Sequence, residues 1–240
     1  MRSPFGPKKS SVKDARRDPR LPMKPLHKIS LQFEKNEMFY KVANISIGGI
    51  GFFSENRSFN GNRNPLIQLN IDTKKFEVRI GIIYQGDKVT GSYFINPEAK
   101  LTEAIENYFV TELAALKVNK VESKSEGATH GKMIFFRGQN NCEILIHERD
   151  DLLAHFSIIL FGNYIEGSGN GPLCFGENID SSIMERPNGV HLFKSLQEAD
   201  PYFIESAIRF IDSVRELSDK QKKSIISLLA NSSRLKTAAK

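Results

Sequence analysis

Hydrophobic and polar positions alternate in short runs over residues 26–95, and the runs are rich in β-branched and aromatic side chains. This pattern predicts half-buried β-strands. Six runs have it: Leu26–Phe33, Met38–Ile45, Ile50–Ser54, Pro65–Ile71, Phe76–Tyr84 and Val89–Ile95. Turn-forming pairs such as Gly48-Gly49 and Gly86-Asp87 separate them. The sequence therefore predicts a six-stranded antiparallel β-barrel, since closure removes exposed sheet edges.

A helix-start signal follows the last predicted strand. Asn96 is a candidate N-cap, Pro97 fits the first helical position and Glu98 the first turn. Apolar residues then recur at helical spacing: Leu101, Ile105, Tyr108, Phe109, Leu113 and Leu116. We expect an amphipathic helix with one face on the barrel or on a partner.

The C-terminal half predicts a mixture of strands and helices. The candidate strands are Lys132–Arg137, Cys142–His147, Ala154–Phe161 and Pro172–Phe175. Asp200 followed by Pro201 is a second cap-plus-proline signal, and Ser218 is a candidate cap for a helix over Asp219–Ala230. Strands followed by two helices indicate an α+β module.

The first 25 residues have a different composition from everything that follows. They are rich in Lys, Arg and Pro and contain almost no periodic apolar residues. Such a segment cannot build a core, so we expect a flexible basic arm. It contains RRDPR at Arg16–Arg20. Taken alone, a basic arm is most simply a solvated tail.

These patterns together predict the fold class and its boundaries. The fold should be mainly β with α+β character, in four segments. These are a basic arm (1–25), the barrel with its closing helix (26–118), a polar linker (119–131) and an α+β module of unknown function (132–240). A chain of 240 residues has room for two domains near the usual size.

Composition changes this prediction little. The chain is 40% hydrophobic and 26% charged, as globular proteins are. Its apolar stretches are too short to span a bilayer, and its N-terminus lacks the apolar run of a signal peptide. We therefore expect a cytoplasmic protein in which Cys142 and Cys174 are buried thiols. A net charge of +6 weakly favours anionic partners.

Two short motifs carry the strongest functional signal. RRDPR supplies Arg16 and Arg20 in the spacing RxxxR, and NISIGG supplies Asn44, Ser46 and Gly49 in the spacing [D/N]xSxxG. With the strand pattern and the closing helix, these residues resemble the PilZ domain family over about residues 12–120. PilZ domains are receptors for the bacterial second messenger cyclic di-GMP. The resemblance implies a PilZ-like barrel and a bacterial, nucleotide-binding signalling protein; it does not extend to the C-terminal half.

The arginines suit such a ligand chemically. Cyclic di-GMP has two phosphodiesters and two guanines, and the planar guanidinium fork can pair a phosphate or the O6 and N7 edge of guanine. It can also stack on a purine. Arg16 and Arg20, four residues apart, can reach different parts of one ligand. Arg17 is a third candidate contact or a screening charge.

The second motif offers complementary groups. The Asn44 amide both donates and accepts, so it can read guanine polar atoms, and Ser46 adds a hydroxyl. Gly49 allows close backbone approach or a positive φ. Without the upstream arginines, NISIGG would be read as a tight strand connection. With them, we assign Asn44, Ser46 and Gly49 to the ligand site.

Signals of catalysis fail on inspection. The glycine-rich loop Gly167–Gly171 is not followed by the Lys-Ser or Lys-Thr pair of a P-loop, so it reads as a hairpin loop. Cys142, His147, His155 and Cys174 fit no familiar zinc spacing. No residue lies in a recognisable nucleophile context. We predict no enzyme activity, no catalytic residue, no metal and no cofactor beyond the ligand.

The leading hypothesis is a cyclic di-GMP receptor that changes the arrangement of its arm and domains on ligand binding and so signals to a protein partner. One alternative is a small barrel that binds nucleic acid, with the arm on phosphates. Another is a PilZ-fold adaptor for protein contacts without ligand. A single-strand binder needs exposed aromatics, whereas five phenylalanines lie in runs that predict at least partial burial. They are Phe33, Phe39, Phe52, Phe76 and Phe94.

Overall fold

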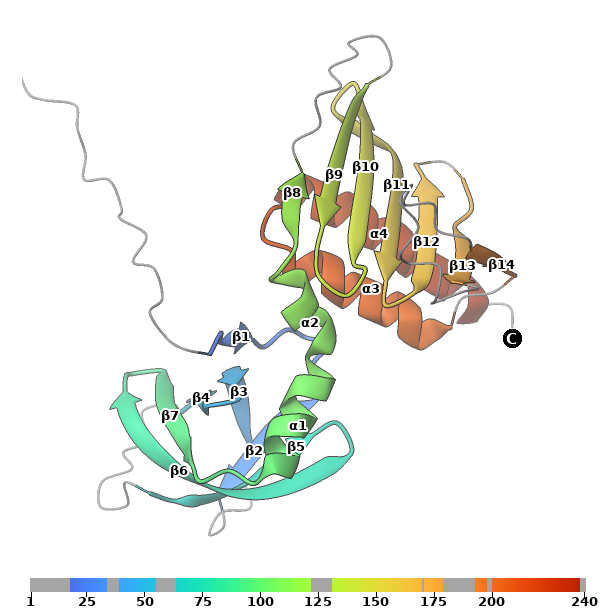
Figure 1. Ribbon diagram of the computed structural model, residues 1–240. Coiled ribbons are helices and arrows are strands. Elements are labelled where there is room, and N and C mark those ends of the chain that lie inside the picture. Colours follow the sequence, from blue (N-terminus) through green and yellow to red (C-terminus); the bar gives the residue numbers. More distant parts are fainter. Residues whose placement is uncertain are drawn as a thin grey trace, which may run out of the picture. The chain divides into compact units, whose positions relative to one another are not determined.

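The computed structural model describes residues 18–33, 39–54, 64–121, 131–169, 171–178, 193–197 and 200–237. The chain divides into two compact units, residues 1–105 and 106–240 (Figure 1). The division falls inside helix α1 (Ala99–Tyr108).

The first unit is a closed antiparallel barrel. Its strands are β1 (Leu21–Pro22), β2 (Ile29–Phe33), β3 (Phe39–Ser46), β4 (Gly49–Phe53), β5 (Leu66–Ile71), β6 (Lys74–Gln85) and β7 (Val89–Ile95). They are ordered β1-β3-β2-β5-β6-β7-β4, and an additional β3–β4 pairing closes a ring of six. The predicted six-stranded barrel is confirmed. The short β1 pairs with β3 outside that ring.

The barrel interior is apolar because alternate strand residues point inward. Ile45, Ile50 and Phe52 are fully buried, and Phe33, Tyr40 and Phe52 form an edge-to-face cluster with centroid distances of 5.0, 5.6 and 5.9 Å. Such pairs add to the free energy of burial.

The predicted burial of the phenylalanines is confirmed for four of the five. Phe33, Phe52 and Phe94 are buried and Phe76 is half-buried. For Phe39 the prediction is wrong, because its side chain is 65% exposed. Phe39 begins β3 beside the buried Tyr40, so alternation directs it out of the barrel.

The helix after β7 begins later than predicted and is interrupted. The Glu98 carbonyl accepts from the amides of Leu101 and Thr102, so α1 starts at Ala99. Asn96 is not its N-cap, since with φ 47° it lies in the preceding turn. Phe109 (φ −102°, ψ 15°) separates α1 from α2 (Val110–Ala115). The single predicted helix is therefore two.

The second unit is a seven-stranded antiparallel sheet covered by helices. Its strands are β8 (Asn119–Val121), β9 (Lys132–Arg137), β10 (Glu143–Arg149), β11 (Leu152–Leu160), β12 (Asn163–Ser168), β13 (Cys174–Asn178) and β14 (Phe193–Leu196). They lie side by side in chain order. The four strands predicted here are present, and β8, β12 and β14 are additional. The predicted fold class, a barrel followed by an α+β module, is confirmed.

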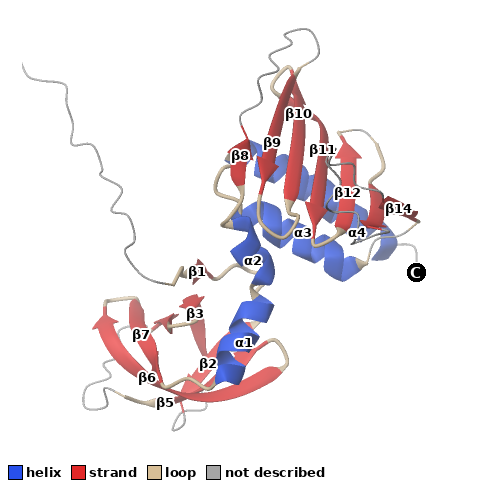
Figure 2. Ribbon diagram, viewed as in Figure 1, coloured by secondary structure: helices blue, strands red, loops and turns tan. Residues whose placement is uncertain are grey.

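Two further helices pack on one face of this sheet (Figure 2). They are α3 (Pro201–Ser213) and α4 (Asp219–Thr237). Both predicted caps are confirmed: Asp200 Oδ1 accepts from the Tyr202 amide at 2.9 Å, and Ser218 Oγ accepts from the Gln221 amide at 3.3 Å. Gln221 Oε1 in turn accepts from the Ser218 amide at 2.9 Å, which completes a capping box.

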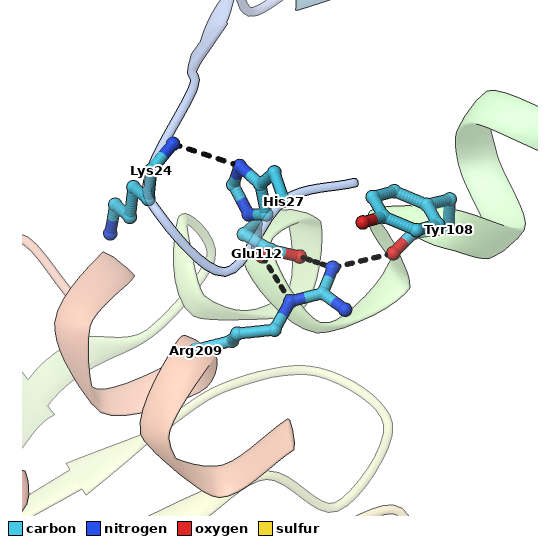
Figure 3. A network of polar contacts seen from close by, with 5 residues as sticks. All are labelled: Lys24, His27, Tyr108, Glu112 and Arg209. Atoms are coloured by element: carbon cyan, nitrogen blue, oxygen red, sulfur yellow. Dashed lines mark hydrogen bonds and ion pairs between the residues drawn. The ribbon is translucent and has the colours of Figure 1, made fainter. Parts of the chain in front are cut away.

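A charged pair is buried among these helices (Figure 3). Arg209 Nε lies 2.7 Å from Glu112 Oε1 and Nη2 lies 2.9 Å from Oε2, and the two side chains are 12% and 2% exposed. Arg209 Nη2 also donates to the Tyr108 carbonyl at 2.6 Å, with the guanidinium 5.0 Å from the Tyr108 ring centroid. Arg209 thus ties α3 to α2 and to the end of α1. Figure 3 also draws a turn of the first unit, in which the Lys24 amide donates to His27 Nδ1 at 3.1 Å.

Within the ranges given above, no helix is long and apolar enough to cross a membrane.

Candidate functional site

Strand β1 attaches the end of the basic arm to the barrel. Leu21 pairs with Ile45 and Pro22 with Asn44, and the Met23 amide donates to the Ala43 carbonyl at 2.9 Å. Leu21 is 4% exposed, so it anchors the strand in the core. Arg20 directly precedes it, and its backbone position is therefore set by β3.

Arg20 and Asn44 meet on the barrel. Arg20 Nη1 donates to Asn44 Oδ1 at 2.8 Å, and Nη2 donates to the Ser92 carbonyl at 3.1 Å. One residue of each sequence motif is thus in direct contact, together with β7. Arg16 and Arg17 lie outside the described residues. The Asn44 and Ser92 acceptors are neutral oxygens, so these two hydrogen bonds orient the guanidinium and do not themselves neutralise its charge.

The Asn44 side chain lies over a glycine. A Cβ added to Gly51, which pairs with Asn44 across β3 and β4, would lie 2.8 Å from Asn44 Oδ1 and 2.9 Å from Nδ2. Any other residue at position 51 would push the carboxamide away. Gly51 therefore holds open the space in which Asn44 receives Arg20.

Ser46 and Gly49 shape the hairpin between β3 and β4. Ser46 is 6% exposed, and its hydroxyl donates to the Gly49 carbonyl at 3.4 Å. A Cβ on Gly49 would clash with the Ser92 carbonyl and lie 2.8 Å from Tyr93 Cα. Gly49 is thus required by the close approach of β4 to β7. Positive φ among the described glycines occurs at Gly131 and Gly162 instead.

An acidic residue of the arm lies beside the same hairpin. A Cβ added to Gly48 would be 3.0 Å from Asp18 Oδ2, so the Asp18 carboxylate lies over the turn. The Arg20 guanidinium and the Asp18 carboxylate therefore both border the β3–β4 hairpin.

Sequence reasoning missed Gly51, Ser92 and Asp18 as parts of this arrangement. Gly51 could have been found, because it follows Gly49 by two residues and so shares its face of the strand. Ser92 contributes a backbone carbonyl, which every residue has, and the sequence gives no signal for it.

The other chemical candidates of the sequence belong to the second unit. In the described part of the chain, no group of three or more His, Cys, Asp or Glu residues could hold a metal ion. Cys142 is buried as expected, but Cys174 is exposed, so its predicted burial is wrong. Gly167 lies inside β12, where a Cβ would clash with Leu173 and lie 2.8 Å from Phe156 Cε1. Packing explains that glycine.

No protein-family model and no curated protein matches the chain. Among solved structures it is similar to an uncharacterized Legionella protein, Lpg0364 (16% identity, 39% of this chain and 90% of that chain, TM-score 0.29). It is also similar to the PilZ domain of CeSA from a cellulose-synthesizing bacterium (14% identity, 39% of this chain and 97% of that chain, TM-score 0.29). A third similar structure is the Borreliella burgdorferi PlzA protein in complex with c-di-GMP (13% identity, 76% of this chain and 86% of that chain, TM-score 0.27). The strand pairings of this chain themselves define its barrel.

Proposed function

We propose that the protein is a receptor for cyclic di-GMP in the bacterial cytoplasm. The observation that supports this most directly is the hydrogen bond from Arg20 to Asn44. It joins the two motifs on which the resemblance to PilZ domains depends. The contact also places a guanidinium group on the outside of a closed barrel, beside an amide that can read guanine.

The geometry favours an anionic, planar ligand. Asn44 and the Ser92 carbonyl hold Arg20 in one orientation before any ligand arrives, which lowers the entropy lost on binding. A fixed guanidinium can pair bidentately with a phosphate or with the O6 and N7 edge of guanine. Arg16 is separated from Arg20 by a chain length of at most about 14 Å. In this proposal Arg16 and Arg17 contact the rest of the same ligand.

The signalling step is part of the proposal. Ligand binding changes the arrangement of the arm on the barrel, and of the barrel and the α+β unit, and thereby engages or releases a protein partner. The attachment of the arm through β1 supports this step, because a ligand held by Arg20 acts directly on the strand that pairs with β3.

Calorimetric titration with cyclic di-GMP tests the proposal. We expect the intact chain to bind with micromolar or tighter affinity, and Arg16→Ala, Arg20→Ala or Asn44→Ala to reduce it at least tenfold, about 1.4 kcal/mol. Ser46→Ala should cost less, because the Ser46 hydroxyl already donates to the barrel itself. Arg137→Ala, in the second unit, is the matched control and should bind normally.

Absence of binding by the intact chain at tens of micromolar would refute the receptor proposal. Equal affinity of all variants would reject the site while leaving the ligand.

A nucleic-acid-binding barrel is the second candidate, because four aromatic side chains of the described barrel strands are exposed. Phe39, Tyr84, Tyr93 and Phe53 are 65%, 60%, 45% and 38% exposed. Single-stranded nucleic acid stacks on such side chains, and its binding weakens steeply with salt. A labelled oligonucleotide titrated at two salt concentrations separates the two candidates.

A further inference from the structure

Two exposed tyrosines, Tyr93 and Tyr84, lie on the same outer face of the barrel as Arg20 and Asn44. Arg20 donates to the Ser92 carbonyl, and Ser92 lies between Gly91 and Tyr93 on β7. The guanidinium therefore reaches across from β3 to the strand that carries Tyr93. The next strand, β6, carries Tyr84 opposite Gly91.

Strand register places these residues on the same side of the sheet as Asn44. Asn44 pairs with Gly51, Gly51 with Gly91 and Gly91 with Tyr84, across β3, β4, β7 and β6. Directly paired residues point to the same face of a sheet. The alternate residues Ile50, Phe52, Thr90 and Ser92 are buried, so this face is the outer one.

No side chain of β4 or β7 stands between Asn44 and Tyr84 in that row, because both intervening residues are glycines. Three inter-strand steps separate Asn44 from Tyr84, about 14 Å along the sheet. The row thus has Arg20 and Asn44 at one end and an aromatic ring at the other.

The tyrosine rings lie low on the barrel surface. Cβ atoms added to Gly81 and Gly86 would clash with the outer ring atoms and hydroxyls of Tyr93 and Tyr84, respectively. Each ring therefore covers the backbone of a glycine. The rings are nevertheless 45% and 60% exposed, which leaves aromatic surface open to a planar group. Purine bases stack on such surfaces.

We propose that the nucleotide site extends from Arg20 and Asn44 over β4 and β7, that Tyr84 stacks on the base most distant from Asn44, and that Tyr93 contacts the ligand from the same face. The inference rests on the proposed function and adds two specificity-determining residues to it. A site with a guanidinium at one end and aromatic rings at the other selects a purine dinucleotide over a mononucleotide, because only the dinucleotide fills both ends.

Titration of the full-length chain with cyclic di-GMP tests the extension. Tyr84→Ala and Tyr93→Ala should each weaken binding at least about fivefold, and Tyr84→Phe should retain it, since stacking needs the ring and not the hydroxyl. Tyr202→Ala, which removes an 80% exposed tyrosine of the second unit, is the matched control. With GMP, which has one base, the loss on Tyr84→Ala should be smaller.

Gly91→Ala adds a test that leaves both tyrosines in place. An added Cβ at position 91 would lie 3.7 Å from Tyr84 Cδ1, an ordinary contact, and alanine is better tolerated in strands than glycine. The melting temperature should stay the same or rise while affinity falls. The chain has no tryptophan and six tyrosines, so quenching of tyrosine emission by bound guanine can be followed directly.

The outcomes separate the two proposals. Unchanged affinity in both tyrosine variants, with Arg20→Ala still deficient, overturns the extension and leaves the receptor function. Loss of oligonucleotide binding in Tyr84→Ala, with unchanged cyclic di-GMP binding, assigns the tyrosines to nucleic acid and also overturns it. Absence of cyclic di-GMP binding by the intact chain overturns both proposals.

Discussion

The buried pair between Arg209 and Glu112 gives the sharpest prediction of stability. Arg209→Met removes the partner of a carboxylate that is 2% exposed, and with it the donor to the Tyr108 carbonyl. Breaking a buried ion pair in this way costs about 3–5 kcal/mol, because the Glu112 carboxylate stays in the core and loses the opposite charge of Arg209. Since the free energy of unfolding of a whole domain is about 5–15 kcal/mol, this loss is a large fraction of the total stability.

A second arginine of the same unit provides the control. Arg137 Nε lies 2.9 Å from Glu143 Oε1, a similar geometry, but Arg137 is 63% exposed. Water solvates the Arg137 guanidinium and screens the pair, so Arg137→Met should cost about 0–1 kcal/mol. The difference between the two variants isolates the effect of burial at nearly constant chemistry.

Urea unfolding followed by circular dichroism at 222 nm measures both effects. The signal reports mainly on the second unit, because α3 and α4 provide most of the helix. The double variant Glu112→Leu with Arg209→Met should recover much of the loss, since a hydrophobic pair leaves no charge behind. A loss below about 1 kcal/mol for Arg209→Met, equal to that for Arg137→Met, would refute this reasoning.

Two further predictions follow from single contacts. Gly49→Ala should destabilise the barrel by about 1–3 kcal/mol, because the new Cβ meets the β7 backbone. Gly51→Ala should mainly lower ligand affinity, since it displaces the Asn44 side chain. Calorimetric melting measures the first effect and titration the second, and a Gly49→Ala melting temperature equal to that of the intact chain would contradict the predicted destabilisation. Burial raises the pKa of the Cys142 thiol above its ordinary value, although a hydrogen bond with the Phe161 backbone opposes the shift. The unfolded chain therefore loses the Cys142 proton at a lower pH than the folded chain, so the free energy of unfolding should fall above about pH 9. The fall should be smaller in Cys142→Ala. At pH 8 a thiol reagent should modify exposed Cys174 far faster than Cys142. Equal pH profiles of the intact chain and Cys142→Ala would contradict this assignment.

The barrel strands could be predicted because each needs only its own residues to show which face is buried. Strand β1 could not. It has two residues and no alternation, and it exists because β3 offers an edge beside a Pro-rich segment. Its formation is a tertiary effect that local propensity does not encode.

Helix caps show the same contrast. Asp200 and Ser218 cap α3 and α4 as predicted, because a cap is a hydrogen bond within one turn of chain. Asn96 has the same sequence signal and fails, since it adopts φ 47° to turn the chain out of β7. Asn tolerates that conformation, so the residue type that favours a cap also favours the turn.

At the candidate site, the two sequence motifs pointed to Arg20 and Asn44, which are in contact in the structure. The motifs could not show which of their residues face outward and which pack on the barrel. Ser46 and Gly49 face the barrel's own backbone, and the structure explains both without a ligand. Tyr84 and Tyr93 lie outside both motifs. Only strand register connects them to Asn44, and it does so through the pairing of β4 with β7, in which Gly51 and Gly91 are far apart in sequence.

Arg209 and Arg20 are both held by hydrogen bonds, but the groups that accept from them differ in charge. Arg209 is matched by the Glu112 carboxylate in the core, so its charge is cancelled where it lies and stabilises the helices. Arg20 is held at the barrel surface by contacts that include two neutral acceptors, the Asn44 amide oxygen and the Ser92 carbonyl, and these two fix the direction of its guanidinium. An anion arriving at Arg20 gains a charge-assisted bond without first breaking the two that position it, because each terminal nitrogen carries two N–H groups. The proposed ligand contact at Arg20 therefore depends on the direction in which Asn44 and Ser92 hold its guanidinium, as well as on its place in the motif.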